Sequence, residues 1–373
     1  MIREGYKRLG DYIEPVDERN SDLSVKLSQG ICNNKYFITP RQVAENSAND
    51  KIVRKGQFAY NRATTRNGDK ISIAYREGED CTVSSAYQIF RIVDEEKLNP
   101  YYLWMWFRRP EFDRYARFKS RGSAHEFFEW DEMCEVYLPV PDIATQRRIV
   151  AEYQAVEKRI AINKNTLSNI DRTITALYEH SFVDSINSNN LPDGWHLGKL
   201  SDIAKYVKDK IGTDTLQEET YISTENMLKE RGGIEIAKSI PSGRATKFSK
   251  GNVLISNIRP YFKKIWYATF DGGCSNDVLC FEAINGFSSQ FLFSTLTKDE
   301  FFDYVMAGSN GVKMPRGDKE WIMKYPVPVP SEELLEDYKR RSSILLSHKE
   351  NLVKENFTLD NILQLLIRKI SMQ

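Results

Sequence analysis

Residues 149–177, IVAEYQAVEKRIAINKNTLSNIDRTITAL, decide the fold of this chain. Alternating steps of four and three residues through this stretch land almost entirely on apolar side chains. They are Ile149, Tyr153, Val156, Ile160, Asn163, Leu167, Ile170, Ile174 and Leu177. This spacing is a heptad seam and predicts a long helix that pairs with another helix. The one amide on the seam, Asn163, is the kind of buried polar group that sets the register between paired helices.

A second, weaker seam lies 189 residues further along the chain. Its positions are Tyr338, Ser342, Leu345, Lys349, Leu352, Asn356, Leu359, Leu363 and Leu366, with Ile370 beyond. Two helices of ~40 residues would each be ~60 Å long. Because isolated amphipathic helices are unstable, we expect the two to pair, antiparallel if a pseudo-twofold axis relates the halves. A homo-oligomeric coil or an ordinary helical bundle is the alternative, but two matched seams in one chain can satisfy one another.

Other parts of the chain recur at nearly the same offset. Residues 136–141, VYLPVP, correspond to 326–330, PVPVP, and Leu9-Gly10-Asp11 corresponds to Leu200-Ser201-Asp202. Short β-type runs precede each proline-rich segment, at 57–60, 71–75, 252–255 and 264–267. A helical piece is expected from Pro100 to about Lys119 in the first half and from Ser288 to about Val305 in the second.

The predicted fold class is therefore α+β, with a tandem duplication of one mixed α/β domain and one long helix. The expected boundaries are 1–141 for the first domain, 142–186 for a central helix, 187–330 for the second domain and 331–373 for a C-terminal helix. The two helices are expected to form an antiparallel coiled coil with pseudo-twofold symmetry.

Composition restricts the class of protein. The chain has 373 residues, and 53 Lys plus Arg balance 52 Asp plus Glu, so the net charge of +1 excludes indiscriminate coating of nucleic acid. No run approaches the ~18 apolar residues of a membrane span, and the first residues lack the apolar core of a secretory signal. The five scattered cysteines include no CxxC pair, which suggests reduced thiols and a cytoplasmic location.

Catalytic chemistry finds no support in the motifs. The four histidines are far apart, without metal-ligand spacing, and no glycine-rich phosphate loop is present. The segment Asn99-Pro100-Tyr101-Tyr102 resembles the Asn-Pro-Pro-Tyr motif of amino-methyltransferases, but its second proline is missing. A helix start is the favoured interpretation of that segment. We therefore predict a noncatalytic chain with no bound cofactor or metal.

Local charge points to binding. Between Arg244 and Lys264 the chain has six basic residues and no acid, and a second basic run extends from Arg108 to Arg121. Residues 61–70 and 256–264 each follow a predicted strand, and each combines Arg and Asn, which suit guanine and adenine edges, with side chains that suit phosphates. Such runs can also be solvated faces balanced by acids elsewhere, but two loops at equivalent positions favour nucleic acid.

The candidate DNA-contacting residues lie in these loops and in the segments that precede the proline-rich runs. They are Asn61, Arg62, Arg66, Asn67, Lys70, Arg121, Ser123, Arg244, Lys247, Ser256, Asn257, Arg259, Tyr261, Lys263, Lys264, Asn310, Lys313 and Arg316. The DNA sequence they would read does not follow from their identity, because base contacts are few and partly depend on DNA shape.

Several short motifs in a fixed order carry a family resemblance. They are LPDGW at 191–195, LSDI at 200–203, GNVLISNIRP at 251–260, CSNDV at 274–278 and PVPVP at 326–330. In this order they resemble the specificity (S) subunit of type I restriction-modification enzymes. The first half repeats part of the pattern as VP at 140–141 and QRRIV at 146–150. The first half lacks a counterpart of 191–195, and the second lacks a counterpart of Gln146.

The resemblance implies that each domain is a target-recognition domain that reads one half of a bipartite, asymmetric double-stranded DNA site, while the helices set the distance between the halves. It implies two modification (methyltransferase) subunits as partners, with S-adenosylmethionine bound on them, and restriction (endonuclease) subunits. A scaffold with two protein-binding domains is the alternative function. A free-standing methyltransferase built around Asn99–Tyr102 is a third, and it would bind S-adenosylmethionine by itself.

Overall fold

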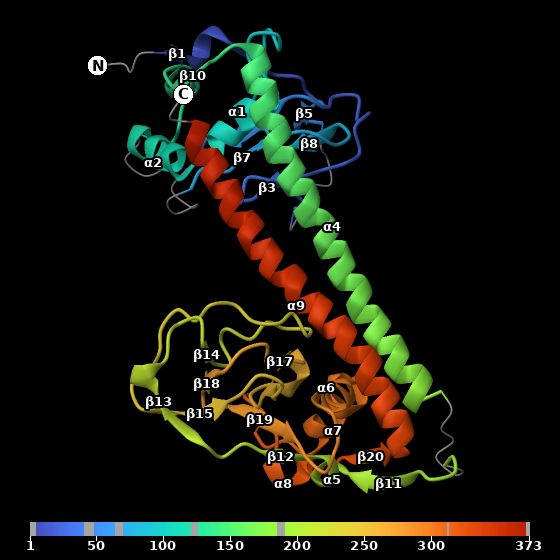
Figure 1. Cartoon of the computed structure of the whole chain (residues 1–373). Helices are drawn as coiled ribbons and strands as arrows, with labels where there is room; N and C mark the ends of the chain where they lie inside the picture. The colour runs from blue at the N-terminus through green and yellow to red at the C-terminus, as the bar shows by residue number, and fades with distance from the viewer. Residues whose placement is uncertain are drawn as a thin grey trace. The chain divides into compact units, whose positions relative to one another are not determined.

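The computed structural model describes residues 5–40, 48–63, 70–120, 126–184, 191–311 and 313–370. The chain forms two compact units. Unit 1 consists of Met1–Ile162 and Asn356–Gln373, and unit 2 of Asn163–Glu355. Two long helices, α4 (Ile143–Phe182) and α9 (Glu332–Lys369), each contribute one part to each unit (Figure 1).

Unit 1 is built on a four-stranded antiparallel sheet in the order β2-β9-β6-β7. These strands are β2 (Ile13–Val16), β9 (Tyr87–Ile92), β6 (Phe58–Asn61) and β7 (Ile73–Tyr75). Three antiparallel strand pairs surround it: β1 (Tyr6–Arg8) with β10 (Tyr137–Pro139), β3 (Gly30–Ile31) with β4 (Phe37–Ile38), and β5 (Lys51–Val53) with β8 (Cys81–Val83). The helical elements are η1 (Leu9–Asp11), α1 (Pro100–Phe107), α2 (Pro110–Lys119) and α3 (Trp130–Cys134).

Unit 2 has a four-stranded sheet in the order β12-β19-β16-β17. Its strands are β12 (Ala204–Tyr206), β19 (Val278–Ala283), β16 (Val253–Ser256) and β17 (Ile265–Tyr267). A second sheet has the order β13-β15-β18-β14, from β13 (Lys210–Gly212), β15 (Arg244–Phe248), β18 (Gly272–Cys274) and β14 (Tyr221–Ile222). β11 (His196–Lys199) pairs with β20 (Pro326–Val329). The helical elements are α5 (Leu200–Ile203), η2 (Thr213–Thr215), η3 (Pro260–Phe262), α6 (Ser289–Thr297), α7 (Asp299–Ala307) and α8 (Lys319–Ile322).

The two main sheets have the same topology, strand for strand. β2, β9, β6 and β7 of unit 1 stand in the same order along the chain and in the sheet as β12, β19, β16 and β17 of unit 2. The pairs β1–β10 and β11–β20 also correspond, as do β5–β8 and β15–β18. The predicted duplication and α+β fold class are therefore confirmed.

The proline-rich segments are strands as well as boundaries. In β10, Pro139 lies opposite Tyr6, and in β20, Pro326 and Pro328 lie opposite Lys199 and Leu197. Both sheets are two-stranded, so each strand has a free edge that can accommodate a residue without an N–H donor. The boundary was predictable from the sequence, but this pairing was not. It ties the start of each domain to the segment before each long helix.

The sequence predicted a single helix after the last strands of each domain. This prediction was wrong in one respect, because the structure has two consecutive helices at each place. α1 ends at Phe107 and α2 begins at Pro110, whose ring is accepted only in the first turn of a helix. In unit 2, Lys298 is extended (φ −65°, ψ 149°) and separates α6 from α7.

Every position of the two predicted seams is buried or half-buried, although Ile367, one residue beyond the predicted Leu366, is the more buried of these two. In unit 1, Ile149, Tyr153 and Ile160 of α4 belong to the same core as Leu363 and Ile367 of α9. In unit 2, Ile170 and Ile174 pack with Leu352.

The direction of the pairing can be followed within unit 2. Asp171 of α4 pairs with Lys349 of α9, and further along α4 the ring of Tyr178 lies 6.0 Å from that of Tyr338. From the first pair to the second, the residue numbers rise along α4 and fall along α9, so these two helix segments are antiparallel. The compact units cut across both helices rather than separating them from the domains, so the four boundaries expected from the sequence stay a prediction.

Two further findings concern the hydropathy of the helices and the cysteines. No helix within the described ranges is long and apolar enough to span a bilayer. Each of the five cysteines is a free thiol.

Candidate nucleic-acid interface

Three segments of unit 2 meet around the loop that follows β16. The N–H of Arg259 donates to the carbonyl of Pro315 (2.8 Å), and the N–H of Gly317 donates to the carbonyl of Asn257 (3.3 Å). The N–H of Asn257 in turn donates to the carbonyl of Asp277 (2.8 Å). We call this group of segments, residues 256–264, 275–277, 309–311 and 313–317, the unit 2 loop cluster. Backbone bonds therefore bring together residues that are up to 60 positions apart in the sequence.

Arg316 is held at the centre of the cluster. Its guanidinium Nη2 lies 3.2 Å from Asp277 Oδ1, and its backbone exchanges two hydrogen bonds of 2.9 Å with Asn310. The Arg316 side chain is 56% exposed, so the ion pair leaves much of the guanidinium open to solvent. The structure thus brings the predicted residues Asn257, Arg259, Asn310 and Arg316 into one surface.

The cluster contains strained backbone and unsatisfied polar atoms. Arg259 (φ 51°) and Lys263 (φ 49°) both adopt the left-handed conformation, which is uncommon for residues other than glycine. Arg259 Nε and Asn257 Oδ1 are buried and have no hydrogen-bond partner among the described residues. Strain and unpaired polar atoms concentrate at functional sites more than elsewhere, so this loop is the strongest candidate for a contact surface.

Gly317 allows the close approach of the two loops. A Cβ at this position would lie 2.8 Å from Asn257 Oδ1 and 2.9 Å from side-chain atoms of Val305 and Ile322. Such contacts are too short for any side chain larger than hydrogen. Sequence reasoning missed Gly317, because the requirement arises from packing between segments.

Lys263 and Lys264 are bound to other parts of unit 2. Lys263 Nζ lies 2.8 Å from Asp299 Oδ1, and Arg231 pairs with the same carboxylate. Hydrogen bonds from these two cations lower the pKa of Asp299 to about 2. Lys264 Nζ donates to the carbonyl of Thr224 (2.6 Å), and burial lowers the pKa of Lys264.

The remaining predicted residues of unit 2 differ in burial and lie on different elements. Ser256 is buried, and its hydroxyl donates to the carbonyl of Ile258 (3.1 Å), whereas Tyr261 is 45% exposed. Arg244 and Lys247 are exposed, but they lie on β15, in the second sheet. Neither makes an ion pair with the residues that the structure describes, and the same holds for exposed Lys313.

Unit 1 has a counterpart of this cluster. Ala63, just after β6, forms a β-bridge with Phe127, as Ile258, just after β16, does with Arg316. Arg62 Nη1 lies 3.2 Å from Glu129 Oε2, and its guanidinium lies 5.9 Å from the ring centre of Phe127.

The other predicted residues of unit 1 divide into two groups. Asn61 Oδ1 accepts a hydrogen bond from the N–H of Ala63 (3.0 Å) and shapes the turn, and Lys70 is exposed. Arg66, Asn67, Arg121 and Ser123 lie outside the described residues.

Most basic side chains of the run before Arg121 pair with acids or stack on an aromatic ring of unit 1. Arg108 Nη1 lies 2.7 Å from Glu157 Oε1, and the Arg109 guanidinium lies 3.9 Å from the ring centre of Trp106. Arg117 pairs with Glu126, and Lys119 pairs with Glu132 at 3.0 Å. These charges join α1 and α2 to the rest of unit 1, so this run is a structural network more than an open basic face.

Acidic partners were the main omission of the sequence analysis. Asp277 orients Arg316, and Glu129 orients Arg62, but neither acid stands near its partner in the sequence. Asp277 does lie within CSNDV at 274–278, one of the motifs that carry the resemblance. That motif was the one feature of the sequence that could have pointed to Asp277.

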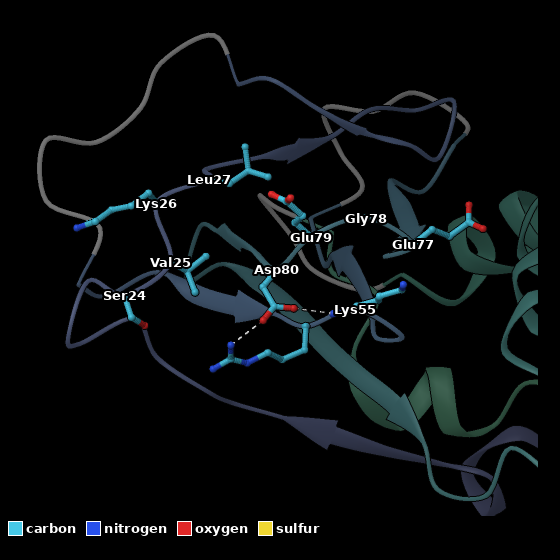
Figure 2. A pocket seen from close by; sticks show the side chains of 10 residues that line it. Ser24, Val25, Lys26, Leu27, Lys55, Glu77, Gly78, Glu79 and Asp80 are labelled. Atoms are coloured by element: carbon cyan, nitrogen blue, oxygen red, sulfur yellow. Dashed lines mark hydrogen bonds and ion pairs between the residues drawn. The ribbon is translucent and has the colours of Figure 1, made fainter.

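Other candidate sites have weaker support. Asn99 accepts a hydrogen bond from the N–H of Tyr102 (3.0 Å) and caps α1, as expected for a helix start. No cluster of three potential metal ligands occurs within the described part of the chain. A hollow in unit 1 lies beside Lys55, Glu79 and Asp80 (Figure 2). Arg54 at its edge pairs with Asp80 (2.7 Å), so charges of opposite sign neutralise one another there.

Comparisons with known proteins agree with this architecture. No family model matches the chain. The "Type I restriction enzyme EcoDI specificity subunit" of Escherichia coli is 23% identical over 170 residues, which cover 44% of this chain and 38% of that protein. The matched part is thus well under half the length of that relative.

Among solved structures, the S subunit of a type I restriction-modification system from M. genitalium has a TM-score of 0.60. It is 13% identical, and the match covers 99% of this chain and 96% of that one. At this identity the likeness shows the fold alone. The chain is therefore similar to type I specificity subunits in sequence over part of its length and in fold over nearly all of it.

Proposed function

We propose that the chain is a DNA sequence-specificity subunit that reads a bipartite, asymmetric site, one half with each unit. The observation that carries this proposal is a repeated scaffold with different side chains at the equivalent loops. The loop after β6 presents Arg62 beside Phe127, whereas the unit 2 loop cluster presents Arg259 and Arg316 beside Asn257. Identical readers would specify a symmetric site, and different readers specify an asymmetric one.

The charge distribution is consistent with selective reading. Some basic side chains in the loops are paired with acids, such as Lys263 with Asp299 and Arg62 with Glu129. Others, such as Lys70 and Lys313, form no ion pair with the described residues and are available to contact phosphates. A few base contacts, each worth ~1–3 kcal/mol of discrimination, would then supply specificity.

We further propose that this chain has no catalytic role and acts in the cytoplasm with partner subunits. Two modification subunits would dock on the long helices and carry the S-adenosylmethionine, and restriction subunits would join them to cleave DNA. Support comes from the names of the similar proteins, which are specificity subunits of type I systems.

Mapping of methylated bases tests the proposal. DNA from cells that express the chain together with a modification subunit should carry methylation at one bipartite motif, and DNA from cells without the chain should lack it. We expect Arg259→Ala to relax or abolish one half of the motif and Arg62→Ala to affect the other half, each by ~1–3 kcal/mol. Each variant is the matched control of the other.

Two results would count against the proposal. Methylation that does not depend on this chain would remove its role in specificity. If both variants changed the same half of the motif, the assignment of one half to each unit would be wrong. A scaffold with two protein-binding domains would leave the methylation pattern unaltered in both variants.

A further inference from the structure

A hollow of unit 2 lies outside the loops described above. It is formed between α8, the end of β11, α5 and β12, elements that lie close together in Figure 1. Its lining includes Lys199, Tyr206, Lys319, Glu320 and Lys324. We call it the α8 hollow.

Hydrogen bonds between three chain segments build the floor of this hollow. The N–H of Leu200 donates to the carbonyl of Tyr325 (2.8 Å), and the N–H of Ser201 donates to that of Met323 (3.0 Å). The Tyr206 hydroxyl donates to the carbonyl of Lys319 (3.1 Å). The backbone positions from which the lysines project are therefore held relative to one another.

The lining of the α8 hollow is positively charged. Lys199, Lys319 and Lys324 are exposed, and none forms an ion pair with a residue in the described ranges. Glu320 is the acid among the lining residues, so three positive charges face one negative charge.

Two further acids stand near the α8 hollow, and both accept hydrogen bonds from the backbone. Asp202 Oδ2 accepts from the N–H of Lys199 (2.7 Å). Asp318 Oδ1 accepts from the N–H groups of Glu320 (2.9 Å) and Trp321 (2.8 Å). These carboxylates cap α5 and α8, and neither of them lines the α8 hollow.

The α8 hollow adjoins the unit 2 loop cluster. Lys319 follows Arg316 by three residues, a separation of at most ~10 Å even for an extended chain. Duplex DNA carries one phosphate charge per ~1.7 Å of its axis. A duplex that contacts Arg316 would therefore have phosphates close to the backbone of Lys319, which lines the α8 hollow together with Lys199 and Lys324.

Among the described residues of unit 1, the corresponding place is not basic. At an offset of 189 residues, Lys319 and Lys324 correspond to Trp130 and Glu135. Lys199 corresponds, at an offset of 191, to Arg8, whose guanidinium lies 2.7 Å from Glu135 and 3.1 Å from Asp11. The same place in unit 1 is thus neutralised.

We propose that the α8 hollow binds phosphates of the DNA backbone beside the half-site read by unit 2. This inference rests on the proposed function and makes the two units unequal. Unit 2 would add a sequence-independent contact that unit 1 lacks. Phosphate contacts by lysine position a protein on DNA without reading bases, and their strength falls with salt.

Salt-dependent binding tests this inference. The full chain, assembled with modification subunits, is titrated with a duplex that contains the mapped site and with an unrelated duplex, between 50 and 200 mM KCl. Lys199→Ala, Lys319→Ala and Lys324→Ala should each lower the slope of log K against log salt by ~1 on both duplexes. The triple variant should lower it by ~3, and the methylated motif should stay unchanged.

Matched variants separate charge from structure. Replacing the three lysines with arginine, in place of alanine, should keep the salt slope of the wild type, because the positive charges are kept. Lys205→Ala, on the same strand as Tyr206, removes an exposed lysine that already pairs with Glu282 (3.1 Å), and it should change the slope less than Lys319→Ala.

Four outcomes would overturn the inference. An unchanged slope in the triple variant would exclude phosphate contacts at the α8 hollow. A changed methylation motif would mean that these lysines read bases. Loss of subunit assembly with an unchanged slope would assign the hollow to an acidic segment of a partner. Absence of salt-dependent binding by the wild-type complex would overturn the proposed function, and this inference with it.

Discussion

At the scale of single residues, unit 2 concentrates unusual conformations where its loops meet. Arg259 and Lys263 are left-handed, Gly317 leaves space for Asn257, and the side chains of Asn257 and Arg259 retain unpaired buried atoms. The left-handed backbone and the unpaired buried atoms are each unfavourable by themselves. Their coincidence in one loop is explained if the loop is shaped in advance to contact a ligand, because a shaped loop loses less entropy on binding.

The carboxylate of Asp299 supports a prediction at this scale. Its folded pKa, about 2, lies below the ordinary value of 3.8, so the unfolded chain takes up its proton first as the pH falls. The stabilisation is complete above pH ~5 and is lost between pH ~4 and ~2. Because this side chain is 59% exposed, we expect Asp299→Asn to cost no more than ~1 kcal/mol at pH 7.

Urea denaturation of the wild type and of Asp299→Asn, measured at pH 7 and at pH 3, tests this expectation. The difference between the two midpoints should shrink at pH 3. A difference that is the same at both pH values would show that Asp299 stabilises unit 2 without its charge.

At the scale of elements, the long helices are joined to their units by different means. Gln146, in the first turn of α4, is fully buried. It accepts a hydrogen bond from the N–H of Asn99 (2.8 Å) and donates to the carbonyls of Lys97 (2.9 Å) and Pro141 (2.7 Å). Its counterpart in α9 at an offset of 189 is Leu335, which packs against the apolar core of unit 2. The missing glutamine is thus replaced by an apolar contact.

The seam of α9 gives a prediction for this scale. Leu352 is 5% exposed and packs with Ile170 and Ile174, whereas Phe357, five residues later, is 67% exposed. We expect Leu352→Ala to lower the free energy of unfolding by ~2–5 kcal/mol and Phe357→Ala to change it by less than ~0.5 kcal/mol. Urea denaturation followed by circular dichroism measures both. Equal effects would mean that the seam is assigned to the wrong face.

At the scale of the whole molecule, α4 is a covalent link between the two units, since it runs without a break from Ile143 to Phe182. Adding one heptad next to Asn163, with a matching heptad in α9, lengthens each helix by ~10 Å while keeping the phase of the seam. We expect the spacer between the two half-sites to grow by ~3 base pairs, at 3.4 Å each, with both half-sites unchanged. Methylation mapping that returned the original spacer would exclude the helices as the device that sets it.

The sequence by itself determined the repeated architecture. Heptad spacing and proline position depend on neighbours a few residues away, so they could be read along the chain at 149–177 and 326–330. The loops after β6 and β16 could be located for the same reason, because each directly follows a recognisable strand.

Only the tertiary structure decided which charges are available. Lys263 and Arg117 looked like open cations in the sequence, yet each pairs with an acid. Arg316 meets Asp277 across 39 positions of chain. Lys199 and Lys319, 120 positions apart, line one hollow. Coulomb interactions depend on distance in space, and strand pairing rather than sequence separation sets that distance.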